Sequence, residues 1–227
     1  MTTPSESLGF IHRFVPAAQS DSSLTLLLLH GTGGDETDLL GVGRQLAPAA
    51  ALLSPRGKVL EDGMPRYFRR LAGGVFDLED LRARAHELAA FVETAAQAYR
   101  LAPDRIFAVG FSNGANIAAG MLLLRPQVLA GAVLFRAMVP LVPETMPQLQ
   151  ARPVLLAAGR QDPIVSPDET ERLRRLLVRA GADVTLHWEQ AAHGLTPRDI
   201  EAARAWLPEG GSPRREGPLG RGGKVRR

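Results

Sequence analysis

The stretch IFAVGFSNGANIAAGMLLL, residues 106–124, combines three signals that together decide the fold. Its first four residues form an apolar run typical of a buried strand, and residues 115–124 are apolar and rich in alanine and leucine, which favour helix. Between them stands GFSNG, residues 110–114, a G-x-S-x-G pattern centred on Ser112. A turn this sharp needs glycine on both sides of the serine, because side chains there would collide with the strand or the helix. The stretch therefore predicts a strand, a tight turn that presents the Ser112 hydroxyl, and a buried helix.

Six further apolar runs flank this unit and alternate with helical segments. This alternation is typical of an α/β protein with a mostly parallel sheet covered by helices on both faces. At 227 residues, the chain suits one such domain, which we place at residues 1–207. The expected strands are residues 11–16, 24–29, 51–54, 106–110, 131–135, 154–158 and 184–188.

Capping residues mark where the other helices begin. Asp77, with Asp80 three residues on, predicts a helix with one apolar face. Two later segments, residues 166–169 and 196–199, place a hydroxyl residue before a proline, with an acidic residue two positions beyond it. That order predicts a capping box at the start of each helix.

Charge and composition exclude several function classes. Residues 208–227 hold six of the 27 basic residues but only two of the 24 acidic ones, which leaves 21 basic and 22 acidic residues in the body. A near-neutral body does not indicate nucleic-acid binding, and the Gly/Pro/Arg-rich segment 208–227 is expected to be a flexible basic tail. The chain has no cysteine, which removes disulfides, thiolate metal sites and a cysteine nucleophile. With no signal-peptide pattern and no apolar run long enough to span a bilayer, we expect a cytoplasmic protein without integral membrane association.

A serine hydroxyl needs a neighbouring base, and that base needs a carboxylate to orient it. Asp162 follows the apolar run of residues 154–158, at the strand end where open parallel sheets build their sites. His193 lies after the last expected strand in a loop of small residues. The chain order Ser112, Asp162, His193 is that of an α/β-hydrolase triad. Asp168 is the competing carboxylate, but the first turn of the following helix accounts for it.

Acyl transfer by serine also needs backbone N–H groups that stabilise the oxyanion. The amide of Asn113 follows the serine directly, and the glycine-rich turn at residues 30–34 follows the apolar run of residues 24–29. We assign Asn113 and Thr32 as the two donors, with His30 bracing the turn. A phosphate-binding interpretation of this turn fails because neither the G-x-G-x-x-G spacing nor a following Lys-Ser/Thr is present.

Taken together, these motifs resemble the phospholipase/carboxylesterase family of small α/β-hydrolases, which includes acyl-protein thioesterases and small bacterial esterases. The resemblance covers about residues 10–207. It implies seven or eight strands without a large cap domain, hydrolysis of carboxylic esters or thioesters of small molecules, and a monomer or homodimer. It also implies that Ser112 is the nucleophile, His193 the general base and then acid, and Asp162 its orienting partner. The stretches that carry the resemblance are residues 29–34, 75–77, 110–115, 159–165 and 193–194.

The substrate pocket is less defined by the sequence. Phe68, Phe76, Met138 and Leu141 are candidate lining residues, although apolar residues more often belong to the core. The Phe-Arg pair at residues 135–136 departs from the smaller or less charged pair expected in many relatives. Its position leaves the shape of the acyl pocket open.

Three alternatives share these features. The same triad serves acyl-thioesterases and acyltransferases, and a scaffold of this fold can bind a ligand without catalysis. No cofactor is implied, and no His/carboxylate cluster has the spacing of a metal site.

Overall fold

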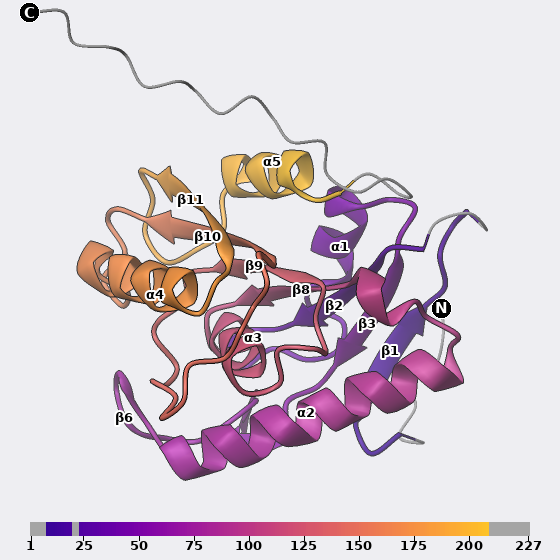
Figure 1. The fold of residues 1–227 in the computed structure, drawn as a ribbon, viewed down its shortest axis with the longest axis horizontal. Coiled ribbons are helices and arrows are strands. Elements are labelled where there is room, and N and C mark those ends of the chain that lie inside the picture. The colour runs from indigo at the N-terminus through magenta and orange to yellow at the C-terminus, as the bar shows by residue number, and fades with distance from the viewer. Residues whose placement is uncertain (1–7, 20–22, 209–227) are drawn as a thin grey trace, which may run out of the picture.

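The computed structural model describes residues 8–19 and 23–208, and its centre is a sheet of seven strands (Figure 1). The spatial order is β1-β3-β2-β8-β9-β10-β11. Only β1 runs antiparallel to its neighbour β3, and the other pairs are parallel. The α/β fold class predicted from the sequence is confirmed. The strands are β1 (His12–Val15), β2 (Thr25–Leu29), β3 (Ala51–Pro55), β8 (Ile106–Phe111), β9 (Gly131–Phe135), β10 (Pro153–Gly159) and β11 (Asp183–Glu189).

Helices cover both faces of this sheet, which is why its inner strands are almost continuously apolar. The larger core lies beneath α2, α3 and α4, and the smaller one beneath α1 and α5. Successive leucines of β2 alternate between the two cores: Leu26 and Leu28 face α1 and α5, whereas Leu27 and Leu29 face the other layer. The helices are α1 (Leu40–Leu46), α2 (Leu78–Ala98), α3 (Asn113–Leu124), α4 (Pro167–Arg179) and α5 (Pro197–Trp206), with a 3₁₀ turn at Pro103–Arg105.

The predicted helix starts are found where the capping residues indicated. Asp77 accepts a hydrogen bond from the Asp80 amide at 3.0 Å, and Thr196 forms a reciprocal capping box with Asp199. The capping box predicted at residues 166–169 is only half formed. Ser166 caps α4, but the Glu169 carboxylate accepts from the Val139 amide at 3.0 Å. A long-range partner has replaced the local one there.

Two short hairpins between β3 and α2 were missed by the sequence analysis. They are formed by β4 (Val59–Glu61) with β5 (Met64–Arg66), and by β6 (Arg70–Ala72) with β7 (Val75–Phe76). In residues 23–208, no separate domain is inserted between the strands of the main sheet. The predicted basic tail lies outside the described residues apart from Pro208. None of the helices in the described part of the chain is both long and apolar enough to cross a membrane.

The strand order reverses between β2 and β8. After β2 the chain adds β3 on one side, and after β8 it adds β9, β10 and β11 on the other. Open α/β sheets bind ligands at such a reversal, beyond the carboxyl ends of the strands. The turn at residues 30–34 leaves the end of β2, and Ser112 leaves the end of β8, so both predicted parts of the site meet there.

Candidate active site

Ser112 occupies a strained turn between β8 and α3. Its φ of 52° and ψ of −113° lie outside the regions that residues with a side chain normally adopt. The Ser112 amide donates to the carbonyl oxygen of Phe135 on β9 at 2.9 Å, which ties the turn to the neighbouring strand. A Cβ on Gly114 would stand 2.0 Å from the Leu29 carbonyl oxygen, and a Cβ on Gly110 would stand 2.5 Å from the Gly114 oxygen. Both glycines are therefore required by backbone contacts, as the G-x-S-x-G pattern predicted.

The three side chains of the predicted triad form one hydrogen-bonded chain. The Nε2 atom of His193 lies 2.9 Å from the Ser112 Oγ, and its Nδ1 lies 2.8 Å from an oxygen of Asp162. A carboxylate can only accept, so Nδ1 carries the proton and Nε2 is free to accept from the serine hydroxyl. This tautomer is the one that a general base beside a serine requires.

Asp162 is held from behind by the backbone that follows it. Its Oδ1 accepts from the amides of Ile164 at 2.8 Å and Val165 at 3.1 Å, which leaves Oδ2 for His193. The Asp162 side chain has no exposed surface, whereas 19% of the His193 side chain is exposed. The Asp162 carboxylate is thus held in place and shielded from solvent, while the His193 imidazole remains accessible to solvent. Asp168 lies in the first turn of α4, as expected.

The two amides predicted as oxyanion donors, those of Asn113 and Thr32, have no acceptor within the described protein. The first turn of α3 leaves its leading amides without helical acceptors, and Asn113 is the first of them. Thr32, in the turn after β2, is exposed. Among the described residues, no protein atom accepts a hydrogen bond from either amide. Both predicted donors therefore keep their N–H groups available at the same end of the sheet.

Arg66 fixes the Thr32 side chain and was not anticipated from the sequence. Its Nη1 donates to the Thr32 Oγ1 at 2.8 Å, and its Nε lies 3.0 Å from a carboxylate oxygen of Glu61. Burial lowers the pKa of the Arg66 guanidinium and the nearby Glu61 carboxylate raises it, but an arginine remains charged throughout the working pH range. A buried cation thus lies next to the turn that carries Thr32.

His30 braces the same turn, as predicted. Its Nδ1 lies 2.6 Å from the Gly31 carbonyl oxygen, and its Nε2 accepts from the Gly57 amide at 2.9 Å. Because Nε2 accepts, the proton of the neutral ring is on Nδ1. Burial lowers the pKa of His30 below its usual value, so the folded protein keeps this ring neutral.

This arrangement predicts a loss of stability in mild acid. Below about pH 6.5 the unfolded chain protonates His30 while the folded chain resists, so the free energy of unfolding falls by up to about 1.4 kcal/mol per pH unit. Glutamine can accept from the Gly57 amide but does not titrate. In His30→Gln, urea unfolding between pH 7.5 and 5 should therefore give lower stability at neutral pH and a flatter decline. Parallel curves for the two proteins would rule this explanation out.

The four candidate pocket residues divide into two kinds. Phe68 and Leu141 are buried within the larger core, whereas Phe76 and Met138 are partly exposed. Phe68 packs edge-on against Phe76, with ring centroids 5.1 Å apart. The Met138 amide donates to the Asn116 side chain at 2.8 Å, which anchors the segment after β9 to α3. Phe76 and Met138 are therefore the two candidates that reach the protein surface.

The pair at residues 135–136, whose effect on the pocket the sequence left open, is buried. Phe135 belongs to the smaller core, and the Arg136 side chain is fully buried and paired with Asp199. The guanidinium charge of Arg136 therefore lies in the protein interior.

The strand order, the turn at Ser112 and the hydrogen-bonded Ser-His-Asp chain define an α/β-hydrolase. The chain belongs to the phospholipase/carboxylesterase family, whose model matches residues 11–209. It is 47% identical over 188 residues to MhqD of Bacillus subtilis (strain 168), a proposed hydrolase, and the match covers 83% of this chain and 94% of that one.

Solved structures show the same likeness. A Bacillus cereus carboxylesterase superposes with a TM-score of 0.84 at 46% identity, over 87% of this chain and 93% of that one. A carboxylesterase from Mesorhizobium loti gives a TM-score of 0.85 at 32% identity, over 90% of this chain and 97% of that one. The predicted family is confirmed.

Proposed function

We propose that this protein hydrolyses carboxylic esters of small molecules through an acyl-enzyme on Ser112. The observation that carries the proposal is the unbroken hydrogen-bonded chain from the Ser112 Oγ through His193 to Asp162. It stands beside the free amides of Thr32 and Asn113, and the names of the carboxylesterase relatives support the same chemistry.

The first half of the reaction acylates the serine. The Ser112 Oγ forms a bond to the ester carbonyl carbon while its proton passes to Nε2 of His193. The electron pair of the carbonyl moves onto its oxygen, where the amides of Thr32 and Asn113 donate to it. When the tetrahedral intermediate collapses, the bond to the leaving alcohol breaks and His193 returns the proton to the departing oxygen.

Water completes the cycle by the same steps. It attacks the acyl carbon as His193 takes one of its protons, and the acid leaves when the bond to Ser112 breaks. The proton on Nε2 then returns to the serine oxygen. Throughout, Asp162 stays ionised and balances the positive imidazolium that forms twice per turnover.

The site favours an acyl group with apolar character. Phe76 and Met138 are the partly exposed apolar side chains among the candidate pocket residues, and Met138 lies close to the hairpin that carries Phe76. A flexible methionine beside an aromatic ring adapts to acyl groups of different shape.

The test combines covalent labelling with product analysis. A fluorophosphonate probe should modify the folded protein at Ser112, as read by mass spectrometry of the peptide, and should not modify heat-unfolded protein. A panel of 4-nitrophenyl esters and acyl thioesters, with and without an alcohol acceptor, should yield free acid most rapidly from esters. Faster thioester cleavage or transfer to the alcohol would replace the proposed reaction with another of the same triad. A folded protein that neither reacts with the probe nor hydrolyses any ester would refute the proposal.

A further inference from the structure

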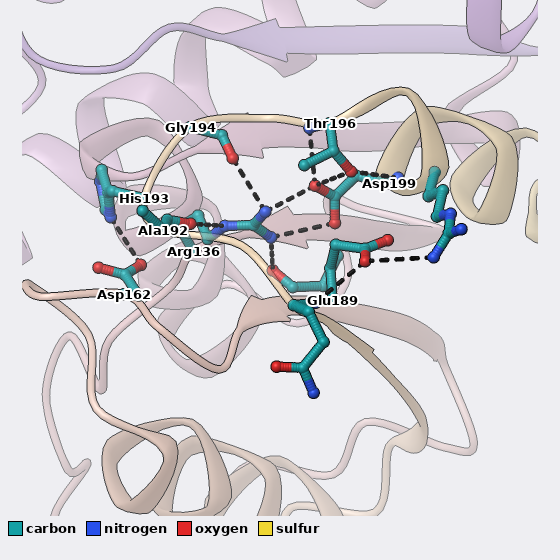
Figure 2. Close-up of polar contacts among 11 residues, drawn as sticks. Arg136, Asp162, Glu189, Ala192, His193, Gly194, Thr196 and Asp199 are labelled. Atoms are coloured by element: carbon teal, nitrogen blue, oxygen red, sulfur yellow. Dashed lines mark hydrogen bonds and ion pairs between the residues drawn. The ribbon is translucent and has the colours of Figure 1, made fainter.

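A fully buried arginine lies directly behind the loop that carries His193. This loop, residues 190–196, connects β11 to α5 and is called the His193 loop below. Arg136 follows β9 with a positive φ of 56°, and its side chain has no exposed surface. Figure 2 shows its guanidinium between Asp199 and the His193 loop. A charge is not buried this deeply unless every donor has a partner.

The guanidinium uses all five of its N–H groups. Nε donates to the Ala192 carbonyl oxygen at 3.2 Å, and Nη2 donates to the Gly194 carbonyl oxygen at 3.0 Å. These carbonyls belong to the residues on either side of His193. The remaining donors reach the Ala157 carbonyl oxygen at 3.1 Å and the two oxygens of Asp199 at 3.1 and 2.6 Å. A planar fork of this kind fixes both position and orientation.

Asp199 continues the connection to the start of α5. The oxygen that accepts from Arg136 at 2.6 Å also accepts from the Thr196 amide at 2.9 Å and the Thr196 hydroxyl at 3.0 Å. Asp199 therefore belongs both to the buried ion pair and to the capping box of α5. The far end of the His193 loop is held by the same carboxylate that neutralises Arg136.

Packing holds only part of the His193 loop: Leu195 packs against the smaller core, and the His193 ring lies 5.4 Å from the Phe111 ring. Ala192 and Gly194 are too small to anchor the backbone through side-chain contacts, and both lie at least partly exposed. On its other side the loop rests on the segment after β10, where the Gln161 amide donates to the Ala191 carbonyl oxygen at 3.1 Å. On either side of His193, hydrogen bonds to the backbone carbonyls thus help to hold the loop, and Arg136 supplies two of them.

We infer that Arg136, charge-balanced by Asp199, is a positioning residue for the general base. The inference rests on the proposed function, because it assigns the pair to the alignment of His193 between Ser112 and Asp162. Neither residue touches the reacting atoms. Their effect is on where the imidazole stands, and a misplacement of about 1 Å in such a group costs up to about 10²-fold in rate.

The decisive comparison uses two variants that keep the buried site neutral. Arg136→Lys retains the charge opposite Asp199 but has three donors on one atom and cannot span Ala192, Asp199 and Gly194. The double variant Arg136→Met/Asp199→Asn removes both charges together, so no unpaired charge stays buried, and the new amide oxygen can still accept from Thr196. With 4-nitrophenyl acetate, each should show kcat lowered by about 10- to 100-fold with little change in KM.

A matched control separates positioning from stability. Leu177 is fully buried on α4, away from the His193 loop, and Leu177→Ala should destabilise the fold while leaving kcat of the folded enzyme unchanged. A second readout needs no substrate. The low-field proton resonance of the His193 Nδ1–H, assigned by its loss in His193→Ala, should weaken in both Arg136 variants and persist in Leu177→Ala.

The outcomes distinguish this inference from the proposed function. If wild type lacks ester hydrolysis, the function is wrong, and the resonance still reports whether Arg136 orders His193. If wild type is active but both variants keep kcat and the resonance, the pair serves stability alone and the inference is overturned.

Discussion

Replacing Ser112 with alanine should lower kcat/KM for 4-nitrophenyl acetate by about 10⁴-fold or more. The substitution removes the atom that bonds to the acyl carbon in the proposed reaction and leaves His193 without a proton to accept. Folding should be unaffected, because serine and alanine both carry a Cβ and meet the same strain at the φ of 52°. Residual activity above the uncatalysed rate is expected from the free amides of Thr32 and Asn113.

Ser166→Ala is the matched control for this variant. The Ser166 hydroxyl caps α4 by accepting from the Glu169 amide at 3.2 Å, so its loss should cost about 1 kcal/mol of stability. Activity should stay at the wild-type level. If Ser112→Ala and wild type have equal activity, and circular dichroism shows that both are folded, Ser112 is not the nucleophile.

Asp162→Asn should lower kcat by about 10⁴-fold without changing the fold. The two amides of Ile164 and Val165 require an oxygen at the Oδ1 position, so the new NH₂ group must face Nδ1 of His193. Two donors cannot share that contact, and the imidazole must carry its proton on Nε2 instead. An Nε2–H points at Ser112 and cannot take its proton. The tautomer, not the position of the ring, is what the substitution changes.

Asp168→Asn makes the same chemical change a few residues away. Asp168 is exposed in the first turn of α4, where its charge contributes about 0.3–1 kcal/mol through the helix dipole. The variant should keep its kcat and lose a little stability, as measured by thermal unfolding. A wild-type kcat in Asp162→Asn would show that another group orients His193.

The sequence predicted the central sheet because its inner strands are buried on both faces and its helices begin at capping residues. Each of the seven expected strands lies within two residues of its observed bounds. The hairpins β4–β5 and β6–β7 escaped because they are short and largely exposed, so they lack a pattern of burial. The helix α1 was not predicted, because no side chain caps its first turn.

The triad could be predicted because each of its residues follows a recognisable apolar run and the three occur in a known chain order. The residues that hold the site in place could not, because they pair with residues far away in the chain. Arg136 and Asp199 lie 63 residues apart in the chain, and Arg66 is 34 residues from Thr32. No periodicity links such pairs. One signal was present: an arginine between two apolar runs needs a buried carboxylate, and Asp199 in its capping box was available.

The contact of Gly114 with the end of β2 has a consequence for how this enzyme could acquire new substrates. Backbone packs against backbone at that point, so the nucleophile turn and the turn that carries Thr32 keep their relative positions whatever side chains surround them. Phe76 and Met138 take no part in that contact or in the triad. If these two side chains line the acyl site, as we propose, mutational drift there is expected to alter which acyl groups fit while the reaction itself is inherited intact.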